Sequence, residues 1–429
     1  MRGAGAWGAA RRVDRATLVV AALTLTYAAV FSWLSIERHR AFATGRFDLG
    51  NMVQAVWSTG QGRILDTTEV GGDQFSRLGA HVDLILVLFT PLYAVWSSPE
   101  SLLVAQAVIV ALGAFPTFWL GRRWLGDDRL AVAAAAAYLL YPPLQFATLF
   151  DFHPVTLAAP LLMLCIWAAE ARRYVVLGVA GAAAALTQEQ VGLALVMLAL
   201  WMAVRHPERR RAAAVMAGAA GAWVLAAVAV ILPRFSLTGG TPQIQRYEAL
   251  GDGEGGVLLT LFTRPWDVAE VLATPGRALY LALLILPLLA LSLLAPLLLA
   301  GALPQLAINL LASGGPPQTI TFHYAAVIAP FVIASAILGL ARLRAWRASG
   351  RLAGMLDDPR RVALGVVGAG VAAGFLLGPL PIWGAIPLGH DGSPHHRFVA
   401  DDHSRAMARA VAMIPPGAPV AASNGPGAH

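Results

Sequence analysis

Long apolar runs separated by short polar segments fill most of this chain. Most runs approach the roughly 20 residues that an α-helix needs to cross the hydrocarbon core of a bilayer. The pattern predicts an all-α fold, a polytopic integral membrane helical bundle of about eleven transmembrane helices. The predicted spans are residues 17–36, 101–120, 130–149, 155–169, 174–186, 191–204, 212–232, 323–340 and 362–385, with two more within residues 278–312.

Two runs do not correspond to one span each. Residues 278–312 are too long for one crossing and contain three prolines, so they are predicted to fold as two spans. Residues 82–96 are short, and a crossing there would place Arg122 and Arg123 on the wrong side of the membrane. We therefore predict an interfacial or re-entrant helix at residues 82–96.

Charge sets the orientation of the predicted bundle. Hydrophobic residues make up 58% of the chain and charged residues only 13%, whereas soluble proteins carry roughly a quarter charged residues. The net charge of +7 comes from arginines that lie in short clusters between apolar runs, which is typical of cytoplasmic loops and does not indicate nucleic-acid binding. We expect a multi-pass plasma membrane protein with a cytoplasmic N-terminus and an extracytoplasmic C-terminus.

The chain is predicted to form one transmembrane domain, residues 1–385. A long first outer loop at 37–100 contains interfacial helices, and a second outer loop lies at 233–276. Residues 386–429 begin an extracytoplasmic C-terminal segment, in which residues 401–414 are predicted to form an amphipathic helix. Because the chain then stops abruptly, we expect that a C-terminal soluble domain is missing.

Apart from the arginines, the ionisable side chains at helix boundaries fall mostly at the predicted outer ends. An ion-coupled transporter usually keeps carboxylates or broken helices near the membrane midplane. None of these residues is predicted in mid-span, so the pattern favours a site at the outer membrane interface. The residues are Asp48, His81, Asp83, Asp151, His153, Glu189 and His323.

Two carboxylates are the candidate catalytic residues. Asp48 precedes a helix that begins near Leu49, so it either caps that helix or acts as a general base that orients an acceptor at the membrane surface. Glu189 lies at the tip of a hairpin of two short runs that cannot cross a core of about 30 Å unaided. Its tip is therefore predicted to lie below the outer surface, where a buried glutamate needs a partner or a function.

Candidate substrate-binding residues lie at the same predicted level. Asp151 and His153 could instead form only a turn between two spans. Metal binding by the histidines is conceivable but has no supporting HxxxH spacing, so neither a metal nor a cofactor is predicted. Arginines of the second outer loop could hold a lipid phosphate through paired hydrogen bonds, although ordinary exposed arginines would look the same. The candidates are His81, Asp151, His153, Arg234, Arg246, Tyr247, His323 and Tyr324.

Several short motifs lie along the chain near the predicted outer ends. They are Phe47-Asp48-Leu49-Gly50, Gln54-Ala55-Val56-Trp57, His81, Pro91-Leu92-Tyr93, Phe152-His153-Pro154, Thr187-Gln188-Glu189 and His323-Tyr324. Together these motifs resemble those of the predicted membrane proteins grouped as domain of unknown function 2079, DUF2079, and the resemblance covers nearly the whole chain. In that family the hairpin tip usually reads Lys-Glu-Asp, so Gln188 and Gln190 are departures, and no role for a lysine at that tip carries over to this chain.

The family is in turn similar to the GT-C superfamily of multi-helix glycosyltransferases, which use polyprenyl-phosphate sugars at the outer face. This resemblance implies a GT-C-like fold with Asp48 at the place of the catalytic carboxylate, and a membrane lipid and a polyprenyl-phosphate-linked sugar as partners. A transporter or flippase is one alternative, and it predicts a water-filled path to the inner face. A non-catalytic scaffold is another, and it predicts polar groups that are satisfied separately, whereas an enzyme requires them to line one cavity.

Overall fold

The computed structural model of the chain describes residues 14–69, 71–237, 242–348, 357–380, 398–415, 417–418 and 420–429. Nearly all secondary structure in these residues is helical, which confirms the all-α prediction. The expectations for the N-terminal residues 1–13, for the end of the last predicted span and for the tail up to residue 397 lie outside the described residues.

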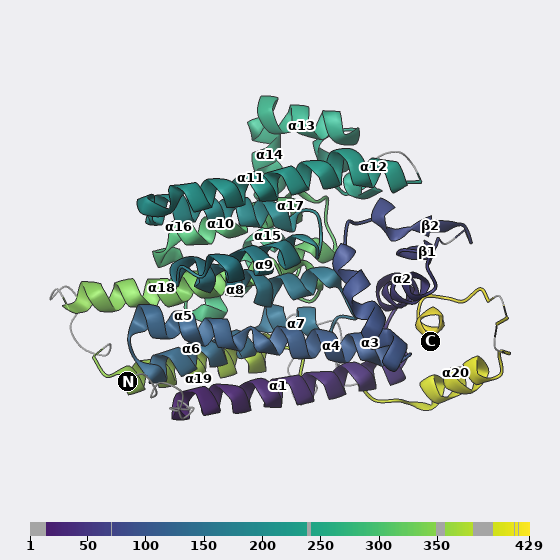
Figure 1. Cartoon of the computed structure of the whole chain (residues 1–429), viewed down its shortest axis with the longest axis horizontal. Coiled ribbons are helices and arrows are strands. Elements are labelled where there is room, and N and C mark those ends of the chain that lie inside the picture. Colours follow the sequence, from purple (N-terminus) through teal and green to yellow (C-terminus); the bar gives the residue numbers. More distant parts are fainter. Residues whose placement is uncertain are drawn as a thin grey trace, which may run out of the picture.

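The helices run in a bundle whose long axis is horizontal in Figure 1. The first half holds α1 Arg15–Arg40, α2 Asn51–Gly60, α3 Thr90–Val95, α4 Pro99–Leu112, α5 Ala114–Leu125, α6 Asp128–Leu140, α7 Pro142–Leu149, α8 Ala158–Glu170, α9 Tyr174–Ala185 and α10 Val191–Arg205. The second half holds α11 Arg210–Ala226, α12 Leu232–Phe235, α13 Gly253–Thr263, α14 Pro265–Leu272, α15 Pro275–Ile285, α16 Pro296–Leu299, α17 Leu303–Leu311, α18 Ala329–Ala348, α19 Pro359–Leu377 and α20 Asp402–Ala412.

Fewer helices are long enough to cross a membrane alone than the eleven predicted. Among the described residues five helical stretches are, or seven if two bent pairs, α6 with α7 and α14 with α15, are each one span. The stretches that hold α8, α9, α10 and α16–α17 are shorter apolar helices. Most of the side chains of α8 are buried by neighbouring helices, so the surrounding bundle rather than lipid covers it.

Acidic side chains cap several helices at one end of the bundle. Asp14 Oδ1 accepts a hydrogen bond from the Thr17 amide (2.9 Å) at the start of α1, and Asp127 caps α6 in the same way. Arg122 near the end of α5 forms ion pairs with Asp14 (2.8 Å) and Asp128 (2.7 Å). One guanidinium thus joins the starts of α1 and α6 to the end of α5.

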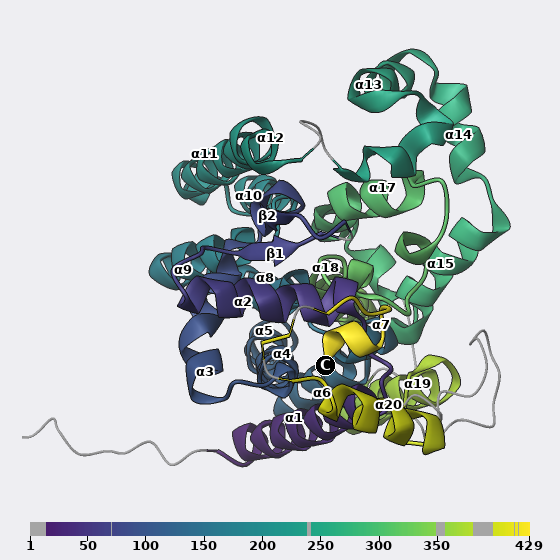
Figure 2. The same ribbon diagram turned by 90° about the vertical axis from the view of Figure 1, so that its right-hand side faces the viewer.

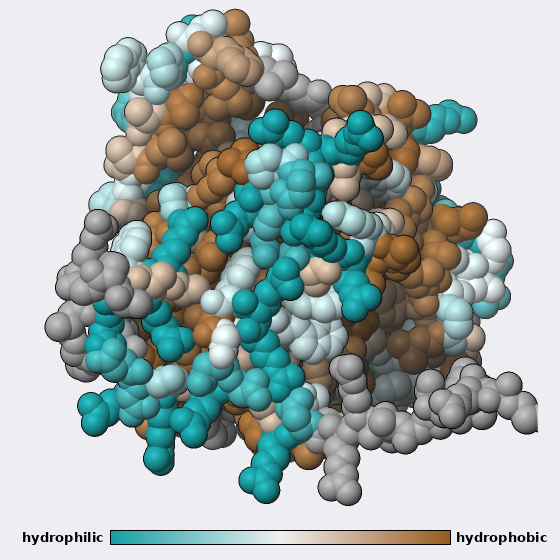
Figure 3. Space-filling model, turned by 60° about the vertical axis from the view of Figure 1, so that its left-hand side comes forward, coloured by the Kyte–Doolittle hydropathy of each residue, from teal (hydrophilic) through white to brown (hydrophobic). Residues whose placement is uncertain are grey.

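Other arginines join further helices at the same place. Arg123 lies 3.5 Å from Glu170 at the end of α8, and Arg209 donates to the Ala169 carbonyl oxygen (2.6 Å). Arg344 of α18 donates to the Leu125 carbonyl oxygen (3.2 Å). We call this the arginine-rich end. Figure 3, in which this side of the molecule is turned toward the viewer, shows a hydrophilic surface flanked by hydrophobic surface. These four arginines, Arg122, Arg123, Arg209 and Arg344, therefore lie at one end, while the side of the membrane that this end faces stays a prediction.

The predicted break within residues 278–312 is present. Helix α15 ends at Ile285, and the chain turns through residues 286–295 before α16 and α17 return. Leu289 and Ala290 adopt φ values of +56° and +54°, the left-handed conformation that ends a helix. The break is therefore where it was predicted, whereas the stretch Pro296–Leu311 that follows is a shorter apolar helix and not a full-length span.

The first outer loop folds over the opposite end of the bundle, which faces the viewer in Figure 2. It contains a π-helical turn at Arg46–Gly50, then α2, and an antiparallel ribbon of β1 (Asp66–Thr68) and β2 (Gln74–Ser76). A short helix over residues 84–95, which includes α3, lies where the interfacial helix was predicted. Buried side chains such as Leu49, Val56 and Phe152 pack this loop against the bundle.

Candidate functional site

A cavity of about 530 Å³ lies under the first outer loop, at the end of the bundle opposite the arginine-rich end. Eight of the ten candidate residues line it, and Asp48, His81, His153, Glu189 and His323 are among them. The polar lining is completed by residues that the sequence did not single out as site residues. These are Arg77, Asp83, Gln188, Gln190, Gln243 and Gln305, with Thr187 at the hairpin tip.

Asp48 and His153 form the central pair. His153 Nδ1 lies 3.1 Å from the Phe150 carbonyl oxygen, and it must donate there because a carbonyl oxygen only accepts. His153 Nε2 lies 3.0 Å from Asp48 Oδ1, so one proton must lie between these two atoms. Burial alone would raise the pKa of Asp48, but the hydrogen bond and charge of His153 outweigh it and lower that pKa. Asp48 is thus a carboxylate that His153 holds from one side.

The alternative that Asp48 caps a helix is wrong. Asp48 lies inside the π-helical turn, whose preceding residue Gly45 makes no side-chain cap. Its carboxylate bonds the His153 ring instead of backbone amides. The extra residue per turn of a π-helix re-aims side chains, and such turns are frequent at functional sites.

His323 stacks on His153 with ring centroids 3.7 Å apart. Burial, and then the positive charges of His153, His81 and nearby arginines, lower the pKa of His323 well below its ordinary value, so its ring is neutral. The next residue, Tyr324, accepts a hydrogen bond from Arg246 Nη1 (3.3 Å). A neutral ring and a guanidinium therefore lie side by side on this wall of the cavity.

Glu189 lies in the cavity as part of a second acid–imidazole pair. Its Oε1 lies 3.0 Å from His81 Nδ1, and its Oε2 accepts from the Val82 amide (2.9 Å). Burial opposes ionisation, but His81 and these hydrogen bonds lower the pKa of Glu189. Only 13% of its side chain is exposed, so the hairpin tip is sunk into the protein. The carboxylate joins the first outer loop to the α9–α10 hairpin.

A buried ion pair supports the cavity wall beside His81. Arg77 Nε donates to Asp83 Oδ2 at 2.7 Å, and both side chains are almost fully buried. Burial raises the pKa of Asp83 against the opposing charge of Arg77. Asp83 was among the ionisable residues predicted at the outer ends, whereas nothing in the sequence singled out its partner Arg77.

The 3₁₀ segment Pro242–Leu250 lines one side of the cavity, and we call it the strap. Gln243 Nε2 lies 3.2 Å from His81 Nε2, and Tyr247 donates to the Ile308 carbonyl oxygen (3.1 Å). Arg246 also lies on the strap, and it donates the hydrogen bond to the Tyr324 hydroxyl. The second outer loop thus supplies one wall of the cavity, and the substrate-binding candidates Arg246 and Tyr247 belong to that wall.

The described tail holds the turn that carries Asp48. The Arg46 amide donates to the Asn424 backbone oxygen (2.7 Å), and the Phe47 amide donates to Asn424 Oδ1 (3.1 Å). The His429 ring stacks on Phe42 at 3.7 Å. Helix α20 confirms the amphipathic helix predicted in the tail, and Asp401 caps it.

Two candidate residues do not line the cavity. Asp151 is buried, with one carboxylate oxygen 3.3 Å from Arg38 and the other accepting from the Gly45 amide (2.7 Å). Burial raises the pKa of Asp151 against the charge of Arg38. Arg234 lies exposed on α12, outside the cavity lining. The two carboxylate oxygens of Asp151 are therefore already bonded, one to Arg38 and the other to the Gly45 amide.

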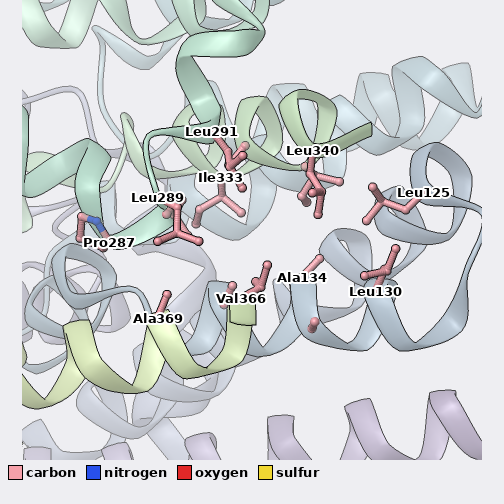
Figure 4. A pocket seen from close by; sticks show the side chains of 15 residues that line it. Leu125, Leu130, Ala134, Pro287, Leu289, Leu291, Ile333, Leu340, Val366 and Ala369 are labelled. Carbon is pink, nitrogen blue, oxygen red and sulfur yellow. The ribbon is translucent and has the colours of Figure 1, made fainter. Parts of the chain in front are cut away.

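A second, smaller pocket is apolar. The pocket in Figure 4 lies among α5, α6, α18, α19 and the turn after α15, and all of its lining side chains are apolar. Its volume of about 30 Å³ is close to the space of one water molecule. Among the described residues no group of three histidine, cysteine or carboxylate side chains is placed to hold a metal ion.

Comparison with known proteins identifies a family but no activity. The family model described as "Predicted membrane protein (DUF2079)" matches residues 38–425. No curated protein and no solved structure matches the chain. The match confirms the family resemblance, while the relation to GT-C glycosyltransferases stays a prediction.

Proposed function

We propose, from the premise that this chain belongs to the DUF2079 family of predicted membrane proteins, that it is a membrane glycosyltransferase acting on a polyprenyl-phosphate sugar at the outer membrane face. One observation carries the proposal. Asp48, held by His153 at 3.0 Å, shares a cavity of about 530 Å³ with Glu189, Arg246 and His323. Such convergence is what an enzyme needs, whereas a scaffold would satisfy these groups separately.

Asp48 is the group proposed to act on the acceptor. Its carboxylate accepts a hydrogen bond from an acceptor hydroxyl and takes that proton as the hydroxyl oxygen bonds to the anomeric carbon of the sugar. The bond from that carbon to the phosphate oxygen breaks at the same time, and its electron pair leaves with the phosphate. Burial raises the pKa of Asp48, but its hydrogen bond with His153 at 3.0 Å outweighs burial, so Asp48 is ionised beforehand.

Arg246 is the proposed phosphate ligand. Arg246 lies on the strap at the cavity wall. Among the described residues its side chain hydrogen-bonds to Tyr324, through the single nitrogen Nη1. A guanidinium has five N–H donors, so donors remain for a phosphate. Holding the leaving phosphate would stabilise the negative charge that develops on it.

Glu189 is proposed as a positioning residue. It fixes the His81 ring and the Val82 amide at once, and so holds the first outer loop against the α9–α10 tip. The transporter alternative predicts a water-filled path toward the arginine-rich end, and the pocket of Figure 4, which lies toward that end, is lined by apolar side chains.

The test is an activity assay with purified protein, polyprenyl-phosphate sugars and a panel of hydroxyl acceptors. Asp48→Asn is expected to lower kcat by about 10²- to 10⁴-fold, which is typical of losing a general base. Asp73→Asn is the matched control, because Asp73 is an exposed carboxylate of the same loop. Equal turnover by wild type and Asp48→Asn would remove Asp48 from the mechanism, and no turnover by the wild type would remove the enzyme.

A further inference from the structure

An open groove lies between α9 and α11, separate from the polar cavity. Its volume is about 580 Å³ and its lining is almost wholly apolar. A Cβ built at Gly178 would meet nothing within 4 Å, and one at Gly181 only atoms at 3.9 and 4.0 Å. The walls include Gly178, Gly181 and Ala182 of α9, Leu195 of α10, and Val215 and Met216 of α11.

The groove faces lipid. The span Pro207–Phe235, which contains α11, has only 17% of its apolar window buried inside the protein. The lining runs from Tyr174 to Leu186 along α9, roughly 18 Å at 1.5 Å per residue. Half of a bilayer core is roughly 15 Å thick, so the groove matches the length of a lipid chain in one leaflet.

The two ends of the groove differ in polarity. Tyr174 and the exposed Arg211 line one end, next to the arginine-rich end. The nearby carboxylate of Glu208 is already paired with Arg172 (3.4 Å) and Arg209 (3.1 Å). At the other end Trp223 donates its indole N–H to the Ala185 carbonyl oxygen (3.0 Å). A polar mouth with a positive charge and an apolar body match an amphiphile with an anionic head.

We propose that this groove binds an acyl chain of an anionic phospholipid from the leaflet at the arginine-rich end, with the phosphate at Arg211. A helix of a second copy does not fit as well, because 18 Å of a helix about 10 Å wide fills roughly 1,400 Å³. A phospholipid also meets the charge of Arg211, which a neutral lipid does not. The site is independent of the proposed glycosyltransferase activity.

Native mass spectrometry of delipidated protein tests this site with phosphatidylglycerol and phosphatidylcholine of the same chains. Wild type is expected to bind phosphatidylglycerol about fivefold more tightly, and Arg211→Gln to remove that preference while still binding both lipids. Gly181→Leu fills the groove and is expected to lower binding of both lipids at least tenfold. Leucine is also the better helix former, so the helix itself is favoured.

Matched controls come from α19, another lipid-facing helix. Gly365→Leu places the same side chain in open space outside the groove, and Arg361→Gln removes an exposed arginine at the start of α19. Neither is expected to change lipid binding. Wild-type binding by a folded Gly181→Leu protein overturns the site, and an unchanged preference in Arg211→Gln overturns the headgroup assignment. Gly178→Leu repeats the test if Gly181→Leu does not fold.

Discussion

The imidazole rings of His323 and His153 stack with centroids 3.7 Å apart and planes 19° apart. The pKa of His323 lies well below its ordinary value, mainly through burial, so the His323 ring is neutral. A neutral ring therefore covers one face of the ring that holds Asp48.

The Asp48–His153 pair predicts a pH-dependent stability. The pKa of Asp48 is below its unfolded value of 3.8, so the pair stabilises the fold above pH 3.8 and stops doing so as the pH falls through the folded-state pKa. Asp48→Asn is expected to lower the free energy of unfolding by about 1 kcal/mol at pH 7, with a smaller loss below pH 3.8. Thermal unfolding across pH measures this, with Asp73→Asn as control. A loss that stays constant down to pH 3 would contradict the pair.

Asp151 is predicted to act on stability rather than on substrate. Asp151→Asn removes a buried ion pair with Arg38 and leaves that guanidinium uncompensated, which should cost about 3–5 kcal/mol. Asp267→Asn breaks an exposed pair with Arg264 and should cost at most about 1 kcal/mol. Denaturant or thermal unfolding in detergent compares the two variants. Similar losses would show that the pair with Arg38 is not a structural anchor.

Two arginines of the second outer loop give a matched test of phosphate binding. Arg246→Gln is expected to raise the KM for a polyprenyl-phosphate donor about tenfold or more, since a charged hydrogen bond to phosphate is lost. Arg234→Gln should leave KM unchanged, because Arg234 lies outside the cavity. Steady-state kinetics across donor concentration measures both. Equal effects of the two variants would argue against a specific role for Arg246.

The pair α13–α14 is predicted to contact lipid. Phe262 and Trp266 are each 83% exposed, and exposed aromatic side chains of this kind mark membrane interfaces. A fluorescent probe attached through Phe262→Cys in a Cys165→Ala background should be quenched by spin-labelled lipids in vesicles. A probe attached through Asp73→Cys should be quenched by iodide in water instead. Iodide quenching at position 262 would place this pair in water.

Apolar patterning was enough to predict where the cavity residues come from. Asp48, His153, Glu189 and His323 each follow or precede an apolar run, so a bundle brings them to one end, and they do line one cavity. Run length was a poorer guide to the number of spans. Helices such as α8 are covered by neighbouring helices, and their length no longer has to match the bilayer.

Local backbone geometry accounts for most of what the sequence did not reveal. Asp151 and His153 are two residues apart, yet the φ of +47° at Asp151 turns the chain so that Asp151 meets Arg38 and His153 faces Asp48. The π-helical turn at Arg46–Gly50 likewise re-aims Asp48 away from the backbone amides. Neither conformation follows from residue types, because positive φ is uncommon even for aspartate, which adopts it more often than most residues, and π-helical turns are rare.

The two hydrogen bonds from Arg46 and Phe47 to Asn424 connect opposite ends of the amino-acid sequence at a single turn. Any displacement of the chain around residue 424 therefore shifts the peptide units next to Asp48, and with them the carboxylate. The position of this acid therefore depends on the chain around Asn424 as well as on the first outer loop.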